Sequence, residues 1–257
     1  MAIITLTSDF GESDHYVGAL KGALLSANPT QVIADISHQI ASFDLAHGAF
    51  VLRSAFPAFP KGSIHLVAVD SAGNQQSRHL AVKLRDHLFL MADHGLLGLI
   101  SDEEPQMVVE LPSDGATSTT FPSLEVLVPA ATQLAKGTPI EKLGTPVEDY
   151  HKMVGRHMRV NKTEIIGHVI RVDHYGNLIT NIKQEEFCRL HQDNKFTILI
   201  GREKFRRLNN NINETGSGDC FILFNHMGLL EVGINKGNAS ELMGLQFDAP
   251  IKITFEN

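Results

Sequence analysis

The sequence predicts an α/β N-terminal domain with a mainly parallel central sheet, followed by an all-β, barrel-like C-terminal domain. Two observations predict this fold class. In the first part of the chain, short β-branched runs alternate with stretches of helical periodicity, a pattern typical of βαβ units. In the second part, short apolar runs are separated by turn residues. We therefore expect domains at residues 1–150 and 164–257, joined by a linker at 151–163.

The elements of the first domain follow from its apolar spacing and its proline positions. Residues 3–7 are apolar and β-branched, which predicts a buried strand. Residues 16–26 carry apolar side chains at helical spacing and end before Pro29. The same criteria predict the elements that follow, in order: a strand at 31–36, a helix at 45–55, a strand at 64–69, a short strand pair at 80–83 and 88–91, and a helix at 129–136.

The pattern changes after Pro146, where polar residues at 148–152 and 161–163 predict a connector. Beyond it, each short apolar run is bounded by turn residues, which predicts a series of strands. These strands are expected at 164–172, 178–182, 196–200, 220–224, 229–234 and 251–255.

Composition excludes several classes of function. The 257 residues carry a formal net charge of −7, whereas broad nucleic-acid binding needs a basic face. Cys188 and Cys220 are too few for a disulfide framework or a cysteine zinc site. No apolar run is long enough to span a bilayer, and the chain does not open like a signal peptide. We expect a cytoplasmic protein with no nucleic-acid or membrane partner.

Acidic residues stand where the predicted strands of the first domain end. Asp9 follows the strand at 3–7, Asp70 follows the strand at 64–69, and Asp14 lies near the start of a predicted helix. Ligands of open α/β sheets bind outside the carboxyl ends of the strands. A carboxylate accepts two hydrogen bonds at once and so suits a vicinal ribose diol. The alternative is that these carboxylates only cap a turn and a helix.

A second polar group, Asp173 to Asn177, joins two predicted strands of the second domain. The common use of Asp, Gly and Asn together is a hairpin turn. Alternatively, the Asn177 amide, which both donates and accepts, reads the edge of a base. The 13 histidines are scattered without His-Glu-x-x-His spacing, so we expect no metal site.

Nine segments form a recognisable pattern by their order and spacing: 3–11, 16–22, 35–38, 43–44, 59–65, 93–97, 120–123, 172–182 and 235–239. Taken together, they resemble the family of adenosine-forming S-adenosylmethionine (SAM) hydrolases and SAM-dependent fluorinating and chlorinating enzymes, also called SAM hydroxide adenosyltransferases. The resemblance implies an α/β domain joined to a β-barrel-like domain. It also implies a homotrimer whose sites lie between the N-terminal domain of one subunit and the C-terminal domain of the next.

The resemblance also implies which residues bind SAM, as substrate and without a further cofactor. Asp9 would hold the ribose hydroxyls, and Phe43 and Phe121 would form apolar walls around the reacting carbon. Asp14 and Asp173 would face the methionine ammonium. Adenine would be contacted by a group in the second domain: Asn177, Asn225, Asn235 and Ala239.

The residues implied to act on the nucleophile depart in part from the family pattern. Asp70 matches the acidic residue that handles water in the hydrolases and that is a tyrosine in the halogenases. The family arginine and histidine positions hold Ser77 and Pro122, although Arg78 is adjacent to the first. Ser123 matches a serine of the halide pocket. We therefore expect Asp70, Ser123 and Arg78 to be the catalytic residues.

Three functions stay open at this point. In the first, water attacks the ribose C5′ carbon and gives adenosine and methionine, with Asp70 as the base. In the second, a halide or another anion is the nucleophile and uses Ser123. In the third, the protein binds the nucleoside without chemistry, since a fold does not fix a function. A carboxylate at position 70 repels a halide and orients water, which favours the first.

Overall fold

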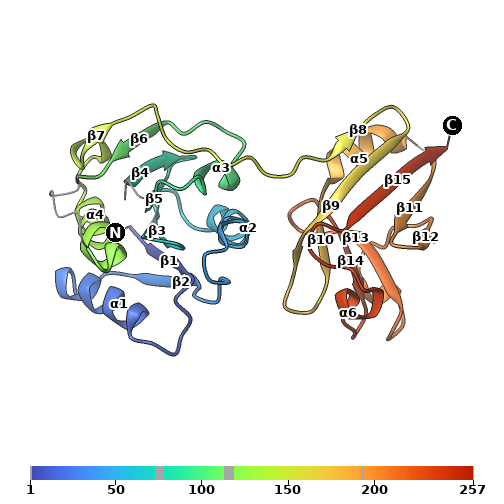
Figure 1. The fold of residues 1–257 in the computed structure, drawn as a ribbon, viewed down its shortest axis with the longest axis horizontal. Coiled ribbons are helices and arrows are strands. Elements are labelled where there is room, and N and C mark those ends of the chain that lie inside the picture. The colour runs from blue at the N-terminus through green and yellow to red at the C-terminus, as the bar shows by residue number, and fades with distance from the viewer. Residues whose placement is uncertain (1, 73–77, 113–118, 193, 257) are drawn as a thin grey trace. The chain divides into compact units, whose positions relative to one another are not determined.

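The computed structural model describes residues 2–72, 78–112, 119–192 and 194–256. It divides the chain into two compact units, unit 1 at Met1–Gly155 and unit 2 at Arg156–Asn257, which we describe separately (Figure 1). Ser77, the expected arginine position, lies outside the described residues.

Unit 1 is built on one sheet with the strand order β2-β1-β3-β5-β4-β6-β7. Strands β2, β1, β3 and β5 run parallel, whereas β4, β6 and β7 pair antiparallel with their neighbours. The sheet is therefore mixed, and the expected mainly parallel sheet is not confirmed. The strands are β1 (Ile4–Ser8), β2 (Ile33–Ser37), β3 (Ile64–Ala68), β4 (His79–Leu84), β5 (His87–Ala92), β6 (Met107–Glu110) and β7 (Thr145–Pro146).

Helices cover both faces of this sheet (Figure 1). On one face, α1 (Tyr16–Ala27) and α4 (Val128–Ala135) pack over β1 and β3 through a fully buried cluster. On the other, α2 (Leu45–Ala55) and α3 (Leu97–Ile100) pack over β3, β4 and β5 through a second buried cluster. Because both faces are covered, β1 and β3 are buried along their whole length. Only the strand ends and the loops after them remain open to a ligand.

Unit 2 is a curled antiparallel sheet with the strand order β12-β11-β15-β9-β10-β14-β13, and β8 pairs with β9 off this path. Strand β9 alternates between buried and half-buried residues, the pattern of a sheet with one face on a core. The strands are β8 (Arg159–Val160), β9 (Glu164–Val172), β10 (Leu178–Lys183), β11 (Lys195–Ile200), β12 (Glu203–Phe205), β13 (Cys220–Phe224), β14 (Leu229–Ile234) and β15 (Pro250–Glu256).

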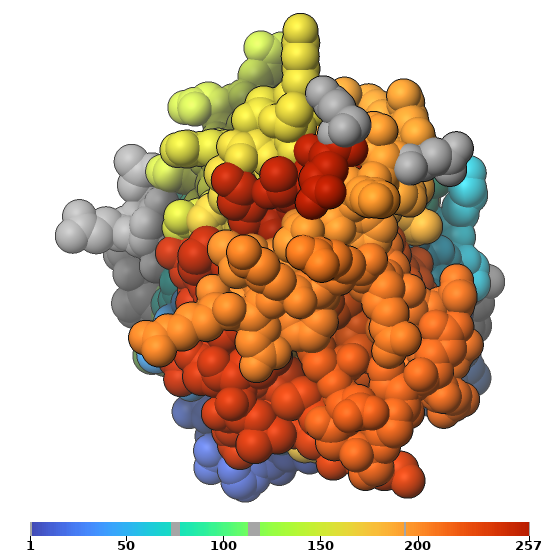
Figure 2. Space-filling view, turned by 90° about the vertical axis from the view of Figure 1, so that its right-hand side faces the viewer, coloured from blue at the N-terminus to red at the C-terminus, as the bar shows by residue number. Residues whose placement is uncertain are grey.

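Unit 2 also carries two short helices, so it is a β unit rather than an all-β one. Helix α5 (Gln184–His191) buries Phe187 against the curled sheet, and α6 (Ala239–Met243) begins at the cap residue Asn238. In Figure 2 this unit faces the viewer, and strands and loops late in the chain, orange to red, form most of the visible surface. No helix among the described residues is long and apolar enough to cross a membrane.

Candidate functional site

The carboxylate of Asp9 joins two loops of unit 1. Its Oδ2 accepts a hydrogen bond from the Phe43 backbone N–H at 2.9 Å and another from the Asp70 N–H at 3.2 Å. Asp9 follows β1, and Asp70 lies beyond the end of the adjacent parallel strand β3, so the strand order brings them to the same edge. The structure therefore brings these two residues together at one edge of the sheet.

Both donors to Asp9 belong to residues in the left-handed backbone region. Phe43 has φ 63° and Asp70 has φ 45°. This conformation costs a non-glycine residue about 1–2 kcal/mol and persists only where the surroundings enforce it. In this conformation, the Phe43 side chain is 73% exposed and is not buried in the core. Such backbone strain is concentrated at functional sites.

Two histidines also form hydrogen bonds to the backbone of the turn that contains Asp70. His94 Nε2 lies 3.0 Å from the Val69 carbonyl oxygen, and His79 Nε2 lies 3.0 Å from that of Ser71. Burial lowers the pKa of His94, although the Val69 bond and the charges of Asp70 and Asp93 act to raise it. The His94 ring is therefore neutral at neutral pH.

Phe121 belongs to an aromatic cluster that the sequence did not indicate. Its ring centroid lies 5.7 Å from that of Phe10 and 5.4 Å from that of Tyr16, both in edge-on geometry. The cluster links the loop after β1 with the start of α1 and the segment before α4. Asp14 is exposed in the same loop after β1. Phe121 is thus held in place by neighbouring aromatic rings, and Asp14 is an exposed carboxylate of the loop after β1.

Ser123 begins a π-helical turn, Ser123–Leu127, directly before α4. Its residue exposure is 0%, and its hydroxyl has no hydrogen-bond partner among the described residues. A buried hydroxyl without a partner is costly, by about 1–3 kcal/mol. Short π-helical turns occur frequently at functional sites. Ser123 therefore carries a buried hydroxyl whose hydrogen-bonding capacity no described residue uses. Pro122, which precedes it, offers no side-chain donor.

Arg78 is committed to a different cluster. Its guanidinium lies 3.3 Å from the Asp93 carboxylate, donates to Glu110 at 3.1 Å and donates to the Asp149 carbonyl at 2.9 Å. Asp93 also accepts the His151 N–H at 2.8 Å. These bonds tie the last segment of unit 1 to its sheet. Because its donors are used there, the structure favours a structural role for Arg78 over the expected catalytic one.

In unit 2, Asp173 closes its own turn. One carboxylate oxygen accepts the N–H groups of Tyr175 and Asn177 at 2.9 and 2.8 Å, and the other accepts the Asn177 side-chain amide at 3.2 Å. This is the hairpin use of Asp that the sequence left open. The turn also needs Gly176, which has φ 81° and whose Cβ position would lie 2.0 Å from Asn238 Oδ1. The tight contact fixes the turn against the start of α6.

Glu231 connects two of the predicted adenine-binding asparagines. Its carboxylate accepts the side-chain amides of Asn177 at 3.1 Å and Asn225 at 3.0 Å. A carboxylate can only accept, so both amide nitrogens must point at Glu231. This fixes the orientation of Asn177, which is 8% exposed, and leaves its Oδ1 as the atom that could accept a hydrogen bond from a base.

The other two predicted adenine-binding residues have structural contacts. Asn235 donates to the Thr215 carbonyl at 2.8 Å and so ties the end of β14 to the loop before β13. Ala239 opens α6 and is completely buried. A ligand contact at Ala239 therefore requires a local movement.

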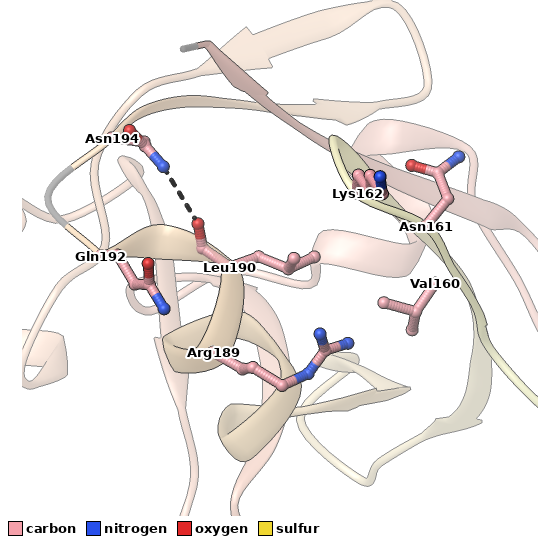
Figure 3. A pocket seen from close by; sticks show the side chains of 7 residues that line it. All are labelled: Val160, Asn161, Lys162, Arg189, Leu190, Gln192 and Asn194. Atoms are coloured by element: carbon pink, nitrogen blue, oxygen red, sulfur yellow. Dashed lines mark hydrogen bonds between the residues drawn. The ribbon is translucent and has the colours of Figure 1, made fainter.

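Unit 2 also has an open hollow of about 440 Å³ that contains none of the predicted site residues (Figure 3). Two cationic side chains, Lys162 and Arg189, line it, and Arg189 is paired with Glu186 at 2.6 Å. Asn194 donates to the Leu190 carbonyl at 3.3 Å. Among the described residues, no group of three or more His, Cys, Asp and Glu side chains could hold a metal ion.

Sequence reasoning missed three residues of these clusters: Glu231, His79 and His94. Glu231 alternates with apolar residues of a strand, which reads as an ordinary exposed position. His79 and His94 stand at strand ends, as Asp9 and Asp70 do, and that shared edge was the signal that could have found them.

Comparison with known families and proteins covers nearly the whole chain. The model of the SAM hydroxide adenosyltransferase N-terminal domain matches residues 4–144, and that of the C-terminal domain of the same family matches residues 167–252.

Individual relatives include a protein named (R)-S-adenosyl-L-methionine hydrolase from Methanocaldococcus jannaschii, 29% identical over 98% of this chain and 96% of its own. A fluorinase from Nocardia brasiliensis is 25% identical and covers 73% of each chain. The crystal structure of an uncharacterised conserved protein from Thermotoga maritima has a TM-score of 0.88 and 27% identity, and covers 98% of this chain and 100% of its own.

Proposed function

The chain belongs to the SAM hydroxide adenosyltransferase family, and we propose that it hydrolyses S-adenosyl-L-methionine to adenosine and L-methionine by attack of water at the ribose C5′ carbon. The observation that carries this proposal is the hydrogen bond from the Asp70 backbone N–H to the Asp9 carboxylate, which brings the proposed ribose-binding residue and the proposed water-binding residue together at one sheet edge. The hydrolase relatives, which match over nearly the full chain, support it.

In this reaction a C5′–oxygen bond forms while the C5′–sulfur bond breaks. The bonding electrons go to sulfur, so the positive sulfonium becomes the neutral thioether of methionine. The attacking water loses one proton, which the Asp70 carboxylate takes up. The leaving group is already activated by its charge, so the protein's task is to position water in line with the breaking bond and to exclude other nucleophiles.

The substrate contacts we propose use atoms that the folded chain leaves available. Both backbone donors occupy Oδ2 of Asp9, so Oδ1 is left for the ribose diol. Asn177 would accept a hydrogen bond from the adenine amino group through Oδ1. Asn225 and Asn235 would also contact adenine. Phe43 and Phe121 would wall the reacting carbon, and Ser123 would hold the water through its buried hydroxyl. The negative charges of Asp14 and Asp173 would face the positively charged ammonium group of the methionine part.

We further propose that three copies assemble and that each site combines unit 1 of one subunit with unit 2 of the next. The family resemblance supports this arrangement, and so does the division of the proposed contacts: ribose and water in unit 1, adenine in unit 2. No cofactor is needed beyond the substrate, because water and a carboxylate balance the reaction.

The test is incubation of the pure protein with both sulfonium epimers of SAM in heavy-oxygen water. We expect adenosine that carries the heavy oxygen and unlabelled methionine. The (R) epimer deserves separate measurement because the M. jannaschii relative is named for it. SAM that binds in calorimetry without release of adenosine would contradict the proposal and identify a binding protein.

Halide attack is the second candidate, because Ser123 offers a buried, unpartnered hydroxyl that can donate to an anion and because a fluorinase is among the relatives. The same assay with chloride or fluoride separates the two. Under the hydrolysis proposal, no 5′-halogenated nucleoside is formed and the rate of adenosine release does not depend on halide.

A further inference from the structure

Asp70 stands in a backbone turn that is held at three consecutive residues. Its own N–H donates to Asp9 at 3.2 Å, the carbonyl before it meets His94 Nε2 at 3.0 Å, and the carbonyl after it meets His79 Nε2 at 3.0 Å. A carbonyl oxygen can only accept, so both imidazoles must carry their proton on Nε2. The tautomer of each histidine is thereby fixed by the turn.

The sheet order explains why these two histidines reach the same turn. Strand β5 runs parallel to β3, so His94, just beyond β5, lies at the edge where β3 ends. Strand β4 runs antiparallel to β5, so His79, its first residue, lies at that edge as well, opposite Ala92. Three neighbouring strands therefore deliver one carboxylate and two imidazoles to one place.

The left-handed conformation has a cost of about 1–2 kcal/mol for a residue with a side chain, so contacts from other elements help to keep it. With φ 45°, Asp70 would relax to negative φ if either flanking carbonyl were released. Relaxation would turn its carboxylate and move its N–H away from Asp9. The turn is also buried at its flanks, where Val69 is fully buried and Ser71 nearly so, so water cannot easily replace a lost donor.

We propose that His79 and His94 are positioning residues for the reaction, which hold the water-handling carboxylate of Asp70 in its left-handed conformation by clamping the carbonyls on either side. This inference rests on the proposed hydrolysis for its kinetic consequence. The family histidine position holds Pro122, whereas the clamp supplies imidazoles to the Asp70 turn from two other strands.

The kinetic test compares three variants of the full chain. His94→Ala removes the donor and is expected to lower kcat about 10- to 100-fold, as misplacement of a reacting group does, with KM changed less than about threefold. His94→Gln places an amide N–H at the position of Nε2 and is expected to recover most of kcat. His87→Ala, a control at the buried histidine that begins β5, is expected to leave kcat unchanged even where it lowers the melting temperature.

Wild-type kcat in His94→Ala would overturn the clamp. So would a His94→Gln enzyme as slow as His94→Ala, because the imidazole itself would then be required.

If the wild-type protein releases no adenosine, the proposed hydrolysis fails, and the proposed clamp is then tested by nuclear magnetic resonance alone. That measurement should find both rings as Nε2–H tautomers and an Asp70 amide shift that changes in His94→Ala and returns in His94→Gln. An Nδ1–H tautomer or an unmoved amide refutes it.

Discussion

At the scale of single residues, the carboxylate of Asp70 is the group that we propose accepts the proton of the attacking water. Asn is among the residues that most readily adopt positive φ, so Asp70→Asn should keep the turn and its bond to Asp9. It removes the charge that takes up the proton. We expect kcat to fall about 100- to 10,000-fold. Steady-state release of adenosine measures the loss, and unchanged SAM affinity in calorimetry serves as the control. A variant with near wild-type kcat would remove Asp70 from the mechanism.

Glu231 gives a second residue-scale prediction, for binding instead of chemistry. In Glu231→Gln the new amide nitrogen faces the amide nitrogen of Asn177 or of Asn225, and one asparagine must turn over. Loss of one oriented acceptor for the base is expected to raise KM for SAM about tenfold, which corresponds to about 1.4 kcal/mol, with kcat nearly unchanged.

The matched control is Glu185→Gln on the exposed side of α5, which should change neither constant. A fall in kcat of Glu231→Gln as large as the expected rise in KM would mean that this glutamate acts on the reaction and not on the binding of adenine.

At the scale of elements, the pairing of β3 with β5 buries a hydrogen-bonded histidine chain. His65 accepts or donates at 2.7 Å with Thr5 and at 3.0 Å with His87. Burial, with a smaller contribution from His87, lowers the pKa of His65 from 6.5 to about 3. The folded protein therefore binds fewer protons than the unfolded chain between these values. The contribution of the neutral His65 ring to the free energy of unfolding is therefore complete above pH 6.5 and decreases as the pH falls toward 3.

We expect the opening free energy of β3 and β5 to drop by up to about 1.4 kcal/mol per pH unit on account of His65 within this window. Hydrogen exchange of the β3 and β5 amides at about pH 7 and about pH 5 measures the drop, and His65→Gln should show a shallower one. Parallel slopes in the two proteins would show that His65 is not buried in its neutral form.

The elements also explain which parts of the site were predictable from sequence. Asp9 and Asp70 follow β-branched runs, and the rule that ligands gather at strand ends needs no more information than that. The left-handed conformation of Phe43 and Asp70 had no signal in the sequence, because neither is a glycine and the contacts that favour it come from other elements: Asp9 at both residues, and also His79 and His94 at Asp70. The antiparallel pairing of β4 with β6 was equally hidden, since the short strand at Met107–Glu110 has no distinctive pattern.

At the scale of the whole molecule, the alternation of strands and helices followed by strands alone predicted an α/β unit and a β unit. Helices α5 and α6 escaped prediction because they are short, of eight and five residues, and depend on packing against the curled sheet. Assembly cannot be read from such patterns, because an interface between copies need not differ in composition from other surface.

The proposed trimer predicts that two variants of low activity complement each other when they are expressed together. Asp70→Asn disables unit 1 and Asp173→Asn weakens unit 2, and each substitution leaves the other unit intact. If sites form between neighbouring subunits, then in co-expressed, randomly mixed trimers about a quarter of the sites combine two unaltered units. The kcat/KM of the mixture should then approach that fraction of the wild-type value, well above the mean of the two parents. Light scattering should give a mass of three times 28.2 kDa. Activity equal to the parental mean in a verified mixed trimer would mean that each site is completed within one chain.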